Sequence, residues 1–407
     1  MKVLHIQTGM GSCGNAAFRL HLAMRYAGID SHVHTYLPSV NRNYVTNDAK
    51  GLKTLFHNFF VNAYSAYQLS DKKPDTYLFH FLPFLKHGGM ADLVRDYDVV
   101  YLHWICSNYL SAADIEDLGH TGKPIIFFMH DMWTMTAGCH HSFSCKQYED
   151  GCKNCQMFAN NKKIAKTAVL KKEMFTKYDN FYFVSPSRWM ADCAKRSFVL
   201  KDKPVYNIWN IVDEKIYKSV DKIFAREILN LPKDKYIITF GALGGTGNPY
   251  KGWTYLRDAI NSISLDNVEL VVYGKDYDES VASQLKYPVR FLGPLFDEHI
   301  LALVCNASDL FVSPSLAESF GLTLLENILC GTPVIAFDCT SIPEIVRHGE
   351  NGLIAKYKDY RDLAKCIKTA CLRKKNWHVK SEYTSSGVIK NHLELMNIAL
   401  SNSNGKK

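Results

Sequence analysis

The chain has 407 residues, of which 47% are apolar and 22% charged, and its formal net charge is +8. This length and composition predict two or more globular domains and exclude a disordered or fibrous chain, while the lack of an apolar run of about 18 residues excludes a membrane-spanning helix. The opening residues also lack the apolar core of a signal peptide, so we expect a cytoplasmic protein whose 12 cysteines are thiols or metal ligands rather than disulfides.

The first predicted element is a strand over residues 3–7, followed by a glycine-rich turn and a helix that reaches residue 22. Gly9, Gly11 and Gly14 match G-x-G-x-x-G, a spacing that lets backbone come close to a phosphate or a sugar. Alone the pattern is weak, because dinucleotide oxidoreductases and sugar-transferring enzymes both carry it. A dinucleotide enzyme needs an acidic residue at the end of its second strand, and the strand at residues 31–37 ends without one. The oxidoreductase interpretation is therefore disfavoured.

Residues 52–90 mix aromatic side chains with lysine and histidine and fit no single apolar helical face. Two interpretations stay open. We favour an inserted pair of helices that packs on the first sheet. In the other interpretation the aromatic and basic side chains contact lipid headgroups, and the net charge of +8 favours an anionic inner leaflet.

Further strands are predicted at residues 98–104, 124–131 and 180–187, with helical stretches between them. This alternation is typical of a doubly wound sheet. Ligands of such sheets bind beyond the carboxyl ends of the strands, and His103 and His130, followed by Asp131, fall there. A histidine at a strand end can hydrogen-bond a ligand or serve the structure alone, and we select His130 ahead of His103 as a site residue.

A cysteine-rich insert follows His130. Its cysteines are Cys139, Cys145, Cys152 and Cys155. The C-x-x-C pair at the end is a common half of a tetrahedral zinc site, and His140 and His141 offer alternative ligands. A structural zinc and a set of reduced thiols both stay open. A catalytic zinc is disfavoured, because four protein ligands leave no open position.

The strand and helix pattern restarts near residue 208. A connector is expected at residues 207–218, and the first strand of a second sheet begins at residue 236. A glycine-rich loop containing Lys251 comes next, and a further strand ends at Gly274.

Residues 317–338 carry the most specific pattern of the chain. A helix is expected from Gly321 to Cys330, with Gly331 as its C-terminal stop. Glu318 then lies in the loop before the helix and Glu326 roughly 7 Å into it, at about 1.5 Å per residue. The two carboxylates flank a helix N-terminus, whose free N–H groups attract phosphate, so one acid can hold a sugar and the other a ribose.

This pattern resembles the signature of family 4 of the retaining glycosyltransferases, which share the two-domain GT-B fold. The resemblance implies that Glu318 binds the donor sugar and that Glu326 binds the nucleoside ribose. The residues implied to offer backbone N–H groups to the diphosphate are Ser319, Phe320, Gly321 and Leu322.

The same resemblance implies further roles. Lys251, with Gly252 behind it, matches the family lysine that contacts the donor diphosphate in place of a metal, so no metal is expected for catalysis. Gly274 ends a strand in a loop that skirts the nucleoside, and His130 lies close to the donor sugar. The loop implied to close over donor and acceptor contains Gly11 and Ser12. An arginine that many relatives place before the lysine is replaced here by Gly-Thr-Gly-Asn-Pro.

The implied fold class is α/β of the GT-B type, with two Rossmann-like doubly wound domains facing a central cleft. Residues 1–208 are expected to bind the acceptor and to include the insert at 139–155. Residues 209–375 are expected to bind the nucleotide-sugar, and residues 376–407 to form a helix that returns to the first domain, followed by a tail.

The implied activity is transfer of a sugar, with retention, from a UDP-, GDP- or ADP-linked donor to a hydroxyl of a glycan or lipid-linked acceptor in cell-surface polysaccharide synthesis. His130, Glu318 and Lys251 are the candidate catalytic residues. A GT-B nucleotide-sugar epimerase and a non-catalytic nucleotide-sugar or glycan-binding protein remain as alternatives. No nucleic-acid partner is expected, and peripheral contact with the inner face of the membrane is left open.

Overall fold

The computed structural model describes residues 1–9, 16–37, 44–48, 52–73, 78–107, 109–242, 248–274, 279–373, 377 and 383–404. The chain divides into two compact units. Of the described residues, unit 1 holds those up to Ile211 and those from Ser386 onward, and unit 2 holds those from Val212 to Ser385. The expected candidates Gly11 and Ser12 lie outside the described residues.

Unit 1 is built on a seven-stranded sheet in which every pairing is parallel. In spatial order its strands are β3 (Val45–Asn47), β2 (Asp30–Thr35), β1 (Lys2–Gln7), β4 (Val99–Leu102), β5 (Ile125–Phe128), β6 (Phe181–Ser185) and β7 (Val205–Asn207). The central strands β4, β5 and β6 are buried along their whole length, as their continuous apolar sequences require.

Helices surround this sheet in the way expected of a doubly wound unit. They are α1 (Ala16–Tyr26), α2 (Leu52–Leu69), α3 (Met90–Leu93), α4 (Ala112–His120), α5 (Asn161–Thr176) and α6 (Arg188–Arg196), with short 3-10 turns η1 (Trp133–Met135) and η2 (Gln147–Asp150). Local sequence sets where they begin. Ser111 and Asp114 form a capping box at the start of α4, and Asn160 and Ser187 cap α5 and α6 through their side chains.

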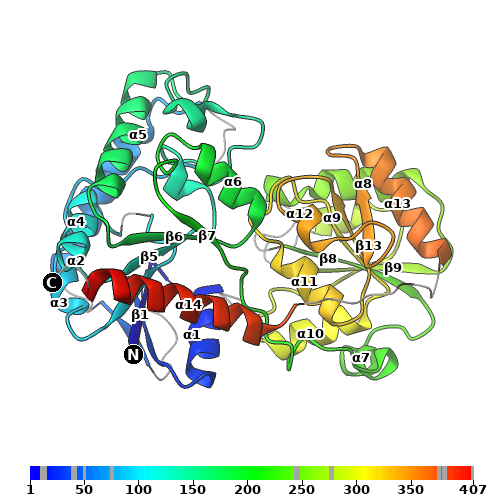
Figure 1. Ribbon diagram of the computed structural model, residues 1–407. Helices are drawn as coiled ribbons and strands as arrows, with labels where there is room; N and C mark the ends of the chain where they lie inside the picture. Colours follow the sequence, from blue (N-terminus) through cyan, green and yellow to red (C-terminus); the bar gives the residue numbers. More distant parts are fainter. Residues whose placement is uncertain are drawn as a thin grey trace. The chain divides into compact units, whose positions relative to one another are not determined.

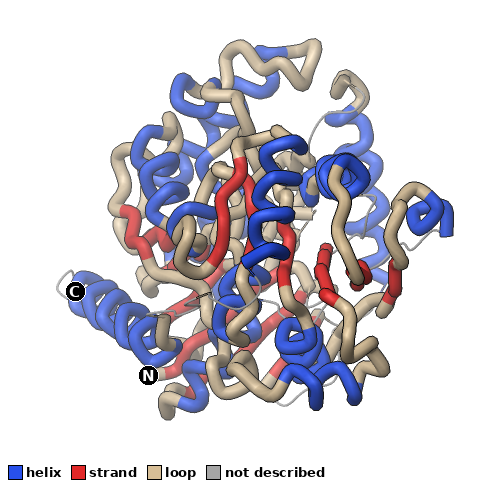
Figure 2. The backbone as a smooth tube through the Cα atoms, turned by 90° about the vertical axis from the view of Figure 1, so that its right-hand side faces the viewer, coloured by secondary structure: helices blue, strands red, loops and turns tan. Residues whose placement is uncertain are grey.

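The last helix, α14 (Ser385–Asn404), packs on the sheet of unit 1 and is red in Figure 1. His392 is fully buried, and its Nδ1 lies 3.0 Å from the hydroxyl oxygen of Tyr101 on β4. Asn402 donates to the Tyr182 hydroxyl on β6 at 3.3 Å. Figure 2 shows the helix that carries the C-terminus beside the strand that begins at the N-terminus. Part of the core of unit 1 therefore comes from the far end of the sequence.

Residues 52–90 differ from the expected pair of helices. Only α2 is a long helix, and residues 78–89 form neither helix nor strand apart from a one-residue antiparallel bridge between Phe79 and Cys139. Pro83 cannot donate a backbone hydrogen bond, and Gly88 and Gly89 have positive φ angles of 84° and 77°, so a second helix cannot run through this segment.

Unit 2 repeats the architecture with a six-stranded, all-parallel sheet. Its strands, in spatial order, are β10 (Val289–Phe291), β9 (Val268–Gly274), β8 (Tyr236–Ala242), β11 (Leu310–Ser313), β12 (Val334–Phe337) and β13 (Gly352–Ala355). Its helices are α7 (Lys222–Ile228), α8 (Trp253–Ser262), α9 (Glu279–Ser283), α10 (Glu298–Ala307), α11 (Leu322–Leu329), α12 (Ile342–Ile345) and α13 (Tyr360–Arg373), with a 3-10 turn η4 (Pro249–Lys251). The expectation of two Rossmann-like doubly wound units is confirmed.

Each sheet reverses its strand order once, between β1 and β4 in unit 1 and between β8 and β11 in unit 2. In open parallel sheets, ligands bind beyond the carboxyl ends of the strands at such a reversal. These two places therefore define where a site should be sought in each unit. Among the helices in the described ranges, none combines the length and the apolarity that crossing a bilayer requires.

Candidate functional site

In unit 2, two loops meet beyond the carboxyl ends of β8 and β11. The Leu316 N–H donates to the Tyr250 carbonyl at 2.8 Å. Gly252 has a φ of +68°, and a Cβ at this position would lie 2.0 Å from the Pro314 carbonyl oxygen. A side chain is therefore excluded at residue 252 by both the backbone angle and the close approach. This contact fixes the lysine before it against the chain leaving β11.

The loop contact brings Lys251 and Glu318 together. The Lys251 Nζ lies 2.6 Å from Glu318 Oε1, and the two side chains are 25% and 15% exposed. The backbone of Glu318 is fixed on both sides, because its N–H donates to the Thr340 hydroxyl at 2.9 Å and its carbonyl accepts from the Ser341 hydroxyl at 2.8 Å. Two of the three predicted catalytic residues thus form one partly exposed ion pair.

The next helix, α11, begins beside this pair. Gly321 is its N-cap with a φ of +93°, and having no side chain it cannot cap the first-turn N–H groups. Such a turn is a ready site for a phosphate. Of the residues expected to line it, Ser319 and Leu322 are partly exposed and Phe320 is buried, so Phe320 contributes backbone and packing. The predicted strand, helix and glycine stop are confirmed, and the Gly331 N–H closes the helix on the Ile328 carbonyl.

Glu326 lies one turn further along α11 and is only 3% exposed. Its neighbour Tyr273, the residue before Gly274 at the end of β9, is also buried. Burial, followed by nearby negative groups that include Glu326, raises the pKa of Tyr273 well above its usual range. In the described part of the chain the Tyr273 hydroxyl has no hydrogen-bond partner. The Tyr273 hydroxyl could therefore hydrogen-bond a ligand that binds beside Glu326.

Tyr273 was not singled out from the sequence. Its ring lies against Gly241 on β8, where an added Cβ would be 1.9 Å from the ring carbon Cζ. Gly274 itself has a φ of 135° and donates its N–H to the Gly293 carbonyl at 2.9 Å. A tyrosine directly before a strand-ending glycine was the available signal for this residue.

In unit 1, histidines form a chain that runs from His5 within β1 to His103 and His130, which follow β4 and β5. His5 Nδ1 lies 2.9 Å from His103 Nε2, and His103 Nδ1 lies 2.8 Å from His130 Nε2. The rings of His103 and His130 stack with their centroids 5.1 Å apart. Because one nitrogen of His103 faces His5 and the other faces His130, the tautomers of the three rings are coupled, and His103 holds Nε2 of His130.

These imidazoles are held neutral. Burial lowers the pKa of His130 to about 4, and burial, followed by the neighbouring histidines, lowers the pKa of His103 and of His5 well below the usual value. A neutral imidazole can donate or accept one hydrogen bond without adding charge. At neutral pH the arrangement therefore suits recognition of a sugar hydroxyl better than pairing with an anion.

Beside His130, Asp131 pairs with His140, a histidine of the cysteine-rich insert. The Asp131 Oδ2 lies 2.6 Å from His140 Nδ1, and its Oδ1 accepts the Trp133 N–H at 2.8 Å. Burial opposes ionisation of Asp131, but its electrostatic interaction with the His140 ring and its hydrogen bonds with His140 and the Trp133 N–H outweigh burial and lower the pKa of Asp131. Asp131 therefore positions the His140 ring and the backbone at Trp133 within the loop.

The four cysteines of the insert lie in this same loop, and the described cysteines are free thiols. Cys152 is buried and Cys145 is exposed. Burial raises the pKa of Cys152 to about 11 and also raises that of Cys155. No three ligand atoms of the four, all of which the structure describes, lie within 4.8 Å of one another. The zinc site of the insert stays a prediction.

The match to a known family lies within unit 2. Residues 234–372 match the family model of the glycosyl transferases group 1. Phosphatidyl-myo-inositol mannosyltransferase of Mycobacterium leprae is 32% identical over 36% of the chain, and an uncharacterized 41.2 kDa protein in the cps region of Klebsiella pneumoniae is 25% identical over 49%. The matched segments span 39% and 54% of those relatives' own lengths.

Solved structures match the whole chain. Sucrose-phosphate synthase from Thermosynechococcus elongatus aligns with a TM-score of 0.68 at 19% identity, covering 99% of this chain and 100% of that one. Anabaena Alr3699/HepE in complex with UDP-glucose aligns with a TM-score of 0.62 at 16% identity, covering 100% of both chains. The chain therefore has the GT-B fold, and the greater part of its second unit is similar to the glycosyl transferases group 1.

Proposed function

We propose that the protein is a retaining glycosyltransferase that moves a sugar from a nucleotide diphosphate donor to a hydroxyl of a glycan or glycolipid in cell-surface polysaccharide synthesis. The observation that carries this proposal is the Lys251–Glu318 ion pair beside the uncapped start of α11. The pair and the helix start both lie in the unit that matches the glycosyl transferases group 1.

The donor would bind with its diphosphate against the first turn of α11. Lys251 would leave Glu318 for the diphosphate, where its charge stabilises the departing group without a metal ion. Glu318, freed from the lysine, would accept hydrogen bonds from the sugar hydroxyls. Glu326 and Tyr273 would hold the nucleoside side, since a buried carboxylate accepts from a ribose that offers two neighbouring hydroxyls.

In the reaction, the bond between C1 of the sugar and the phosphate oxygen breaks, and a bond from C1 to the acceptor oxygen forms on the same face. The acceptor's proton passes to the phosphate oxygen that leaves. His130, kept neutral by burial, would hydrogen-bond the sugar and orient it. No protein nucleophile is required by this scheme.

An exposed aromatic face on α2 supports a membrane-borne acceptor. Phe56, Phe59, Phe60, Tyr64 and Tyr67 are all exposed, and their spacing places them on one side of the helix, away from the buried Val61. Lys72 and Lys73 follow this helix in the sequence, and Lys163, which is paired with Asp71, bonds the Gln68 carbonyl at 2.6 Å. Aromatic rings beside basic groups fit the headgroup region of an anionic leaflet, and we propose that α2 lies there.

The function is tested with purified full-length protein and a panel of UDP-, GDP- and ADP-sugars, with and without glycan or lipid-linked acceptors. Nucleotide release that depends on an acceptor, with an anomer of unchanged configuration by NMR, is the expected result. Release without acceptor and with a changed sugar would indicate the epimerase. Binding without release would indicate a non-catalytic protein.

The membrane contact has its own test, which is sedimentation with vesicles containing phosphatidylglycerol. Binding is expected to fall in a Phe59→Ser, Tyr67→Ser double variant. Leu372→Ser, which removes an equally exposed apolar side chain from α13 in unit 2, is the control and should bind as the wild type does. Equal binding by both variants would remove α2 from the proposal.

A further inference from the structure

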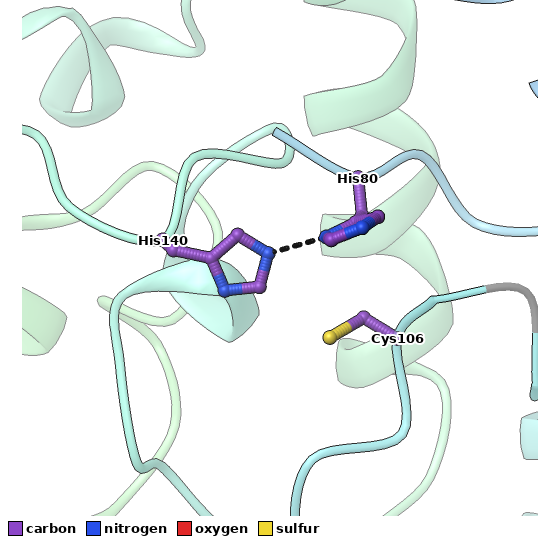
Figure 3. A group of neighbouring side chains, drawn as sticks. All are labelled: His80, Cys106 and His140. Carbon is purple, nitrogen blue, oxygen red and sulfur yellow. Dashed lines mark hydrogen bonds between the residues drawn. The ribbon is translucent and has the colours of Figure 1, made fainter. Parts of the chain in front are cut away.

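Three side chains that bind metals converge in unit 1 beyond the carboxyl end of β4. They are His80, Cys106 and His140, drawn in Figure 3. Their ligand atoms, one imidazole nitrogen from each histidine and the cysteine sulfur, all lie within 4.8 Å of one another. Cys106 and His140 are buried and His80 is partly buried. Within the described ranges, no other three histidine, cysteine or acidic side chains meet this spacing.

Backbone pairing brings the two histidines together from segments far apart in the sequence. The His80 N–H donates to the Gly138 carbonyl at 3.0 Å, and the His140 N–H donates to the Leu78 carbonyl at 3.3 Å. A Cβ at residue 138 would lie 2.5 Å from the His80 carbonyl oxygen, so only glycine allows this approach. The close packing of these two segments sets the distance between the imidazoles.

Each of the three residues is also anchored through its carbonyl. That of His80 accepts from the Trp133 indole at 2.8 Å, that of His140 accepts from the Met132 N–H at 2.9 Å, and that of Cys106 accepts from the Thr8 hydroxyl at 2.7 Å. The side chains therefore project from a backbone that is fixed before any ion binds. Such preorganisation lowers the cost of assembling a site.

The hydrogen bonds of the two histidines leave one nitrogen of each ring, His140 Nε2 and His80 Nδ1, facing the place where a metal would bind. His140 Nδ1 lies 2.6 Å from the Asp131 carboxylate, so Nδ1 carries the proton and Nε2 has a lone pair. A carboxylate behind a histidine in this way is typical of zinc sites. His80 Nδ1 lies 2.7 Å from that Nε2, and its other nitrogen lies 3.3 Å from the Ser107 hydroxyl, which can accept a hydrogen bond from an N–H there.

We propose that His80 Nδ1, His140 Nε2 and Cys106 Sγ bind a zinc ion. One thiolate and two imidazoles are ligands that zinc prefers, and three protein ligands leave a fourth position for water or a ligand hydroxyl. Cys106 releases its proton to solvent on binding, and the proton between the two rings moves to His80 Nε2. Tetrahedral bonds of about 2.0–2.1 Å hold two nitrogens roughly 3.3 Å apart, so the two nitrogens must separate by about 0.6 Å from their present 2.7 Å.

This site is separate from the four cysteines of the insert, although His140 follows Cys139 directly. The ion would join three segments, namely the stretch before α3, the chain leaving β4, and the insert. Asp131, which orients His140, is the neighbour of His130. The zinc would therefore stiffen the loops around the histidine chain.

The test is a titration of the EDTA-treated full-length protein with Co²⁺, followed by displacement with Zn²⁺. A thiolate-to-cobalt charge-transfer band and visible bands of a four-coordinate ion are expected at saturation, and zinc should remove both. Cys106→Ser should abolish the charge-transfer band. His80→Gln should weaken binding at least tenfold, and Asp131→Asn about 10–100-fold through the orientation of His140.

Matched control variants distinguish the loss of a metal ligand from a general loss of folded structure. Cys193→Ser removes another buried thiol of unit 1, and His87→Gln removes another partly buried histidine, so both should bind cobalt as the wild type does. Circular dichroism of every variant without metal checks that it is folded. Loss of the band in Cys152→Ser but not in Cys106→Ser would overturn the proposal, as would the absence of cobalt binding by the wild type.

Discussion

At the carboxyl ends of its strands, unit 1 places a chain of buried neutral imidazoles, whereas unit 2 places glycines, a lysine and two carboxylates. The strand order around the reversal is the same in both sheets. The difference lies in the loops that leave the strands. In unit 2 the Lys251–Glu318 pair stays partly exposed and charged, while in unit 1 burial keeps His130 uncharged.

The contrast indicates how one architecture can serve two kinds of ligand. A diphosphate carries charge and needs a cation and backbone donors, which unit 2 offers. A carbohydrate hydroxyl is neutral and polar, and the histidines of unit 1 offer single, oriented hydrogen bonds. Four predictions test this contrast, from the largest expected effect to the smallest.

Replacing Lys251 by Ala should lower kcat about 10²–10³-fold, because the charge that stabilises the leaving diphosphate is lost. Initial rates with the active donor measure this. Lys235→Ala is the matched control, since Lys235 also pairs with a glutamate, Glu269, at 2.8 Å but lies at the opposite end of β8. Equal rates for the two variants would contradict the role of Lys251.

Replacing Glu326 by Gln should weaken donor binding by roughly 10-fold, or about 1.4 kcal/mol, since a charged acceptor is lost from the nucleoside side. Calorimetry with the nucleoside diphosphate gives the dissociation constant. Glu269→Gln alters another buried carboxylate of unit 2, one held by Lys235 and Arg290, and should affect unfolding rather than donor binding. An unchanged constant for Glu326→Gln would remove this residue from the site.

The free energy of unfolding of unit 1 should fall as the pH drops from about 6.5 towards 4. Burial lowers the pKa of His21, His80 and His130 to about 4 and that of His392 to about 3, so the unfolded chain takes up protons in this range before the folded chain does. The stabilisation is complete above pH 6.5 and is lost as the pH approaches the folded values. Hydrogen exchange, read separately for each unit, measures the difference.

Unit 2 provides the internal reference for that experiment. Its described histidines, His299 and His348, are not buried in a core, so its exchange should change much less over the same range. A His392→Phe variant should flatten the acid dependence of unit 1. Parallel losses in both units would show that the buried imidazoles are not the cause.

Replacing His103 by Phe should lower kcat by about 10-fold with little change in KM for the donor, because His130 loses the partner that sets its tautomer. A shifted acid limb in the pH profile of kcat would distinguish positioning from simple packing. His120→Phe changes an exposed histidine of α4 and should leave both constants unaltered. A change in KM alone would contradict positioning by His103.

The topology was accessible to sequence reasoning because apolar strands and helical stretches alternate in both halves. Glu318 and the start of α11 were placed well by the strand, helix and glycine stop around them. The sequence could not show that the backbone of Gly252 lies close to the Pro314 carbonyl. This close approach is what brings Lys251 to Glu318. That contact joins residues that are far apart in the chain.

Other contacts could not be predicted from the sequence, because the residues that form them come from segments far apart in the chain. In place of the second helix of the pair expected within residues 52–90, residues 78–80 pair with residues 138–140 and carry His80 there. The sequence has no periodic pattern that would predict the proximity of His80 to Cys106 or the burial of Tyr273 beside Glu326. Long-range packing, rather than local propensity, decides these positions.

The return of α14 to the first sheet has a consequence for biosynthesis. Leu395, Met396 and Ala399 are buried, and His392 adds a buried imidazole to the same core. A ribosome that has finished the first half has therefore not yet made the strand-covering helix that this half requires. Maturation of the earliest-synthesised unit must wait until all of unit 2 has been translated, and a stop codon that removes α14 should harm the beginning of the protein more than its middle.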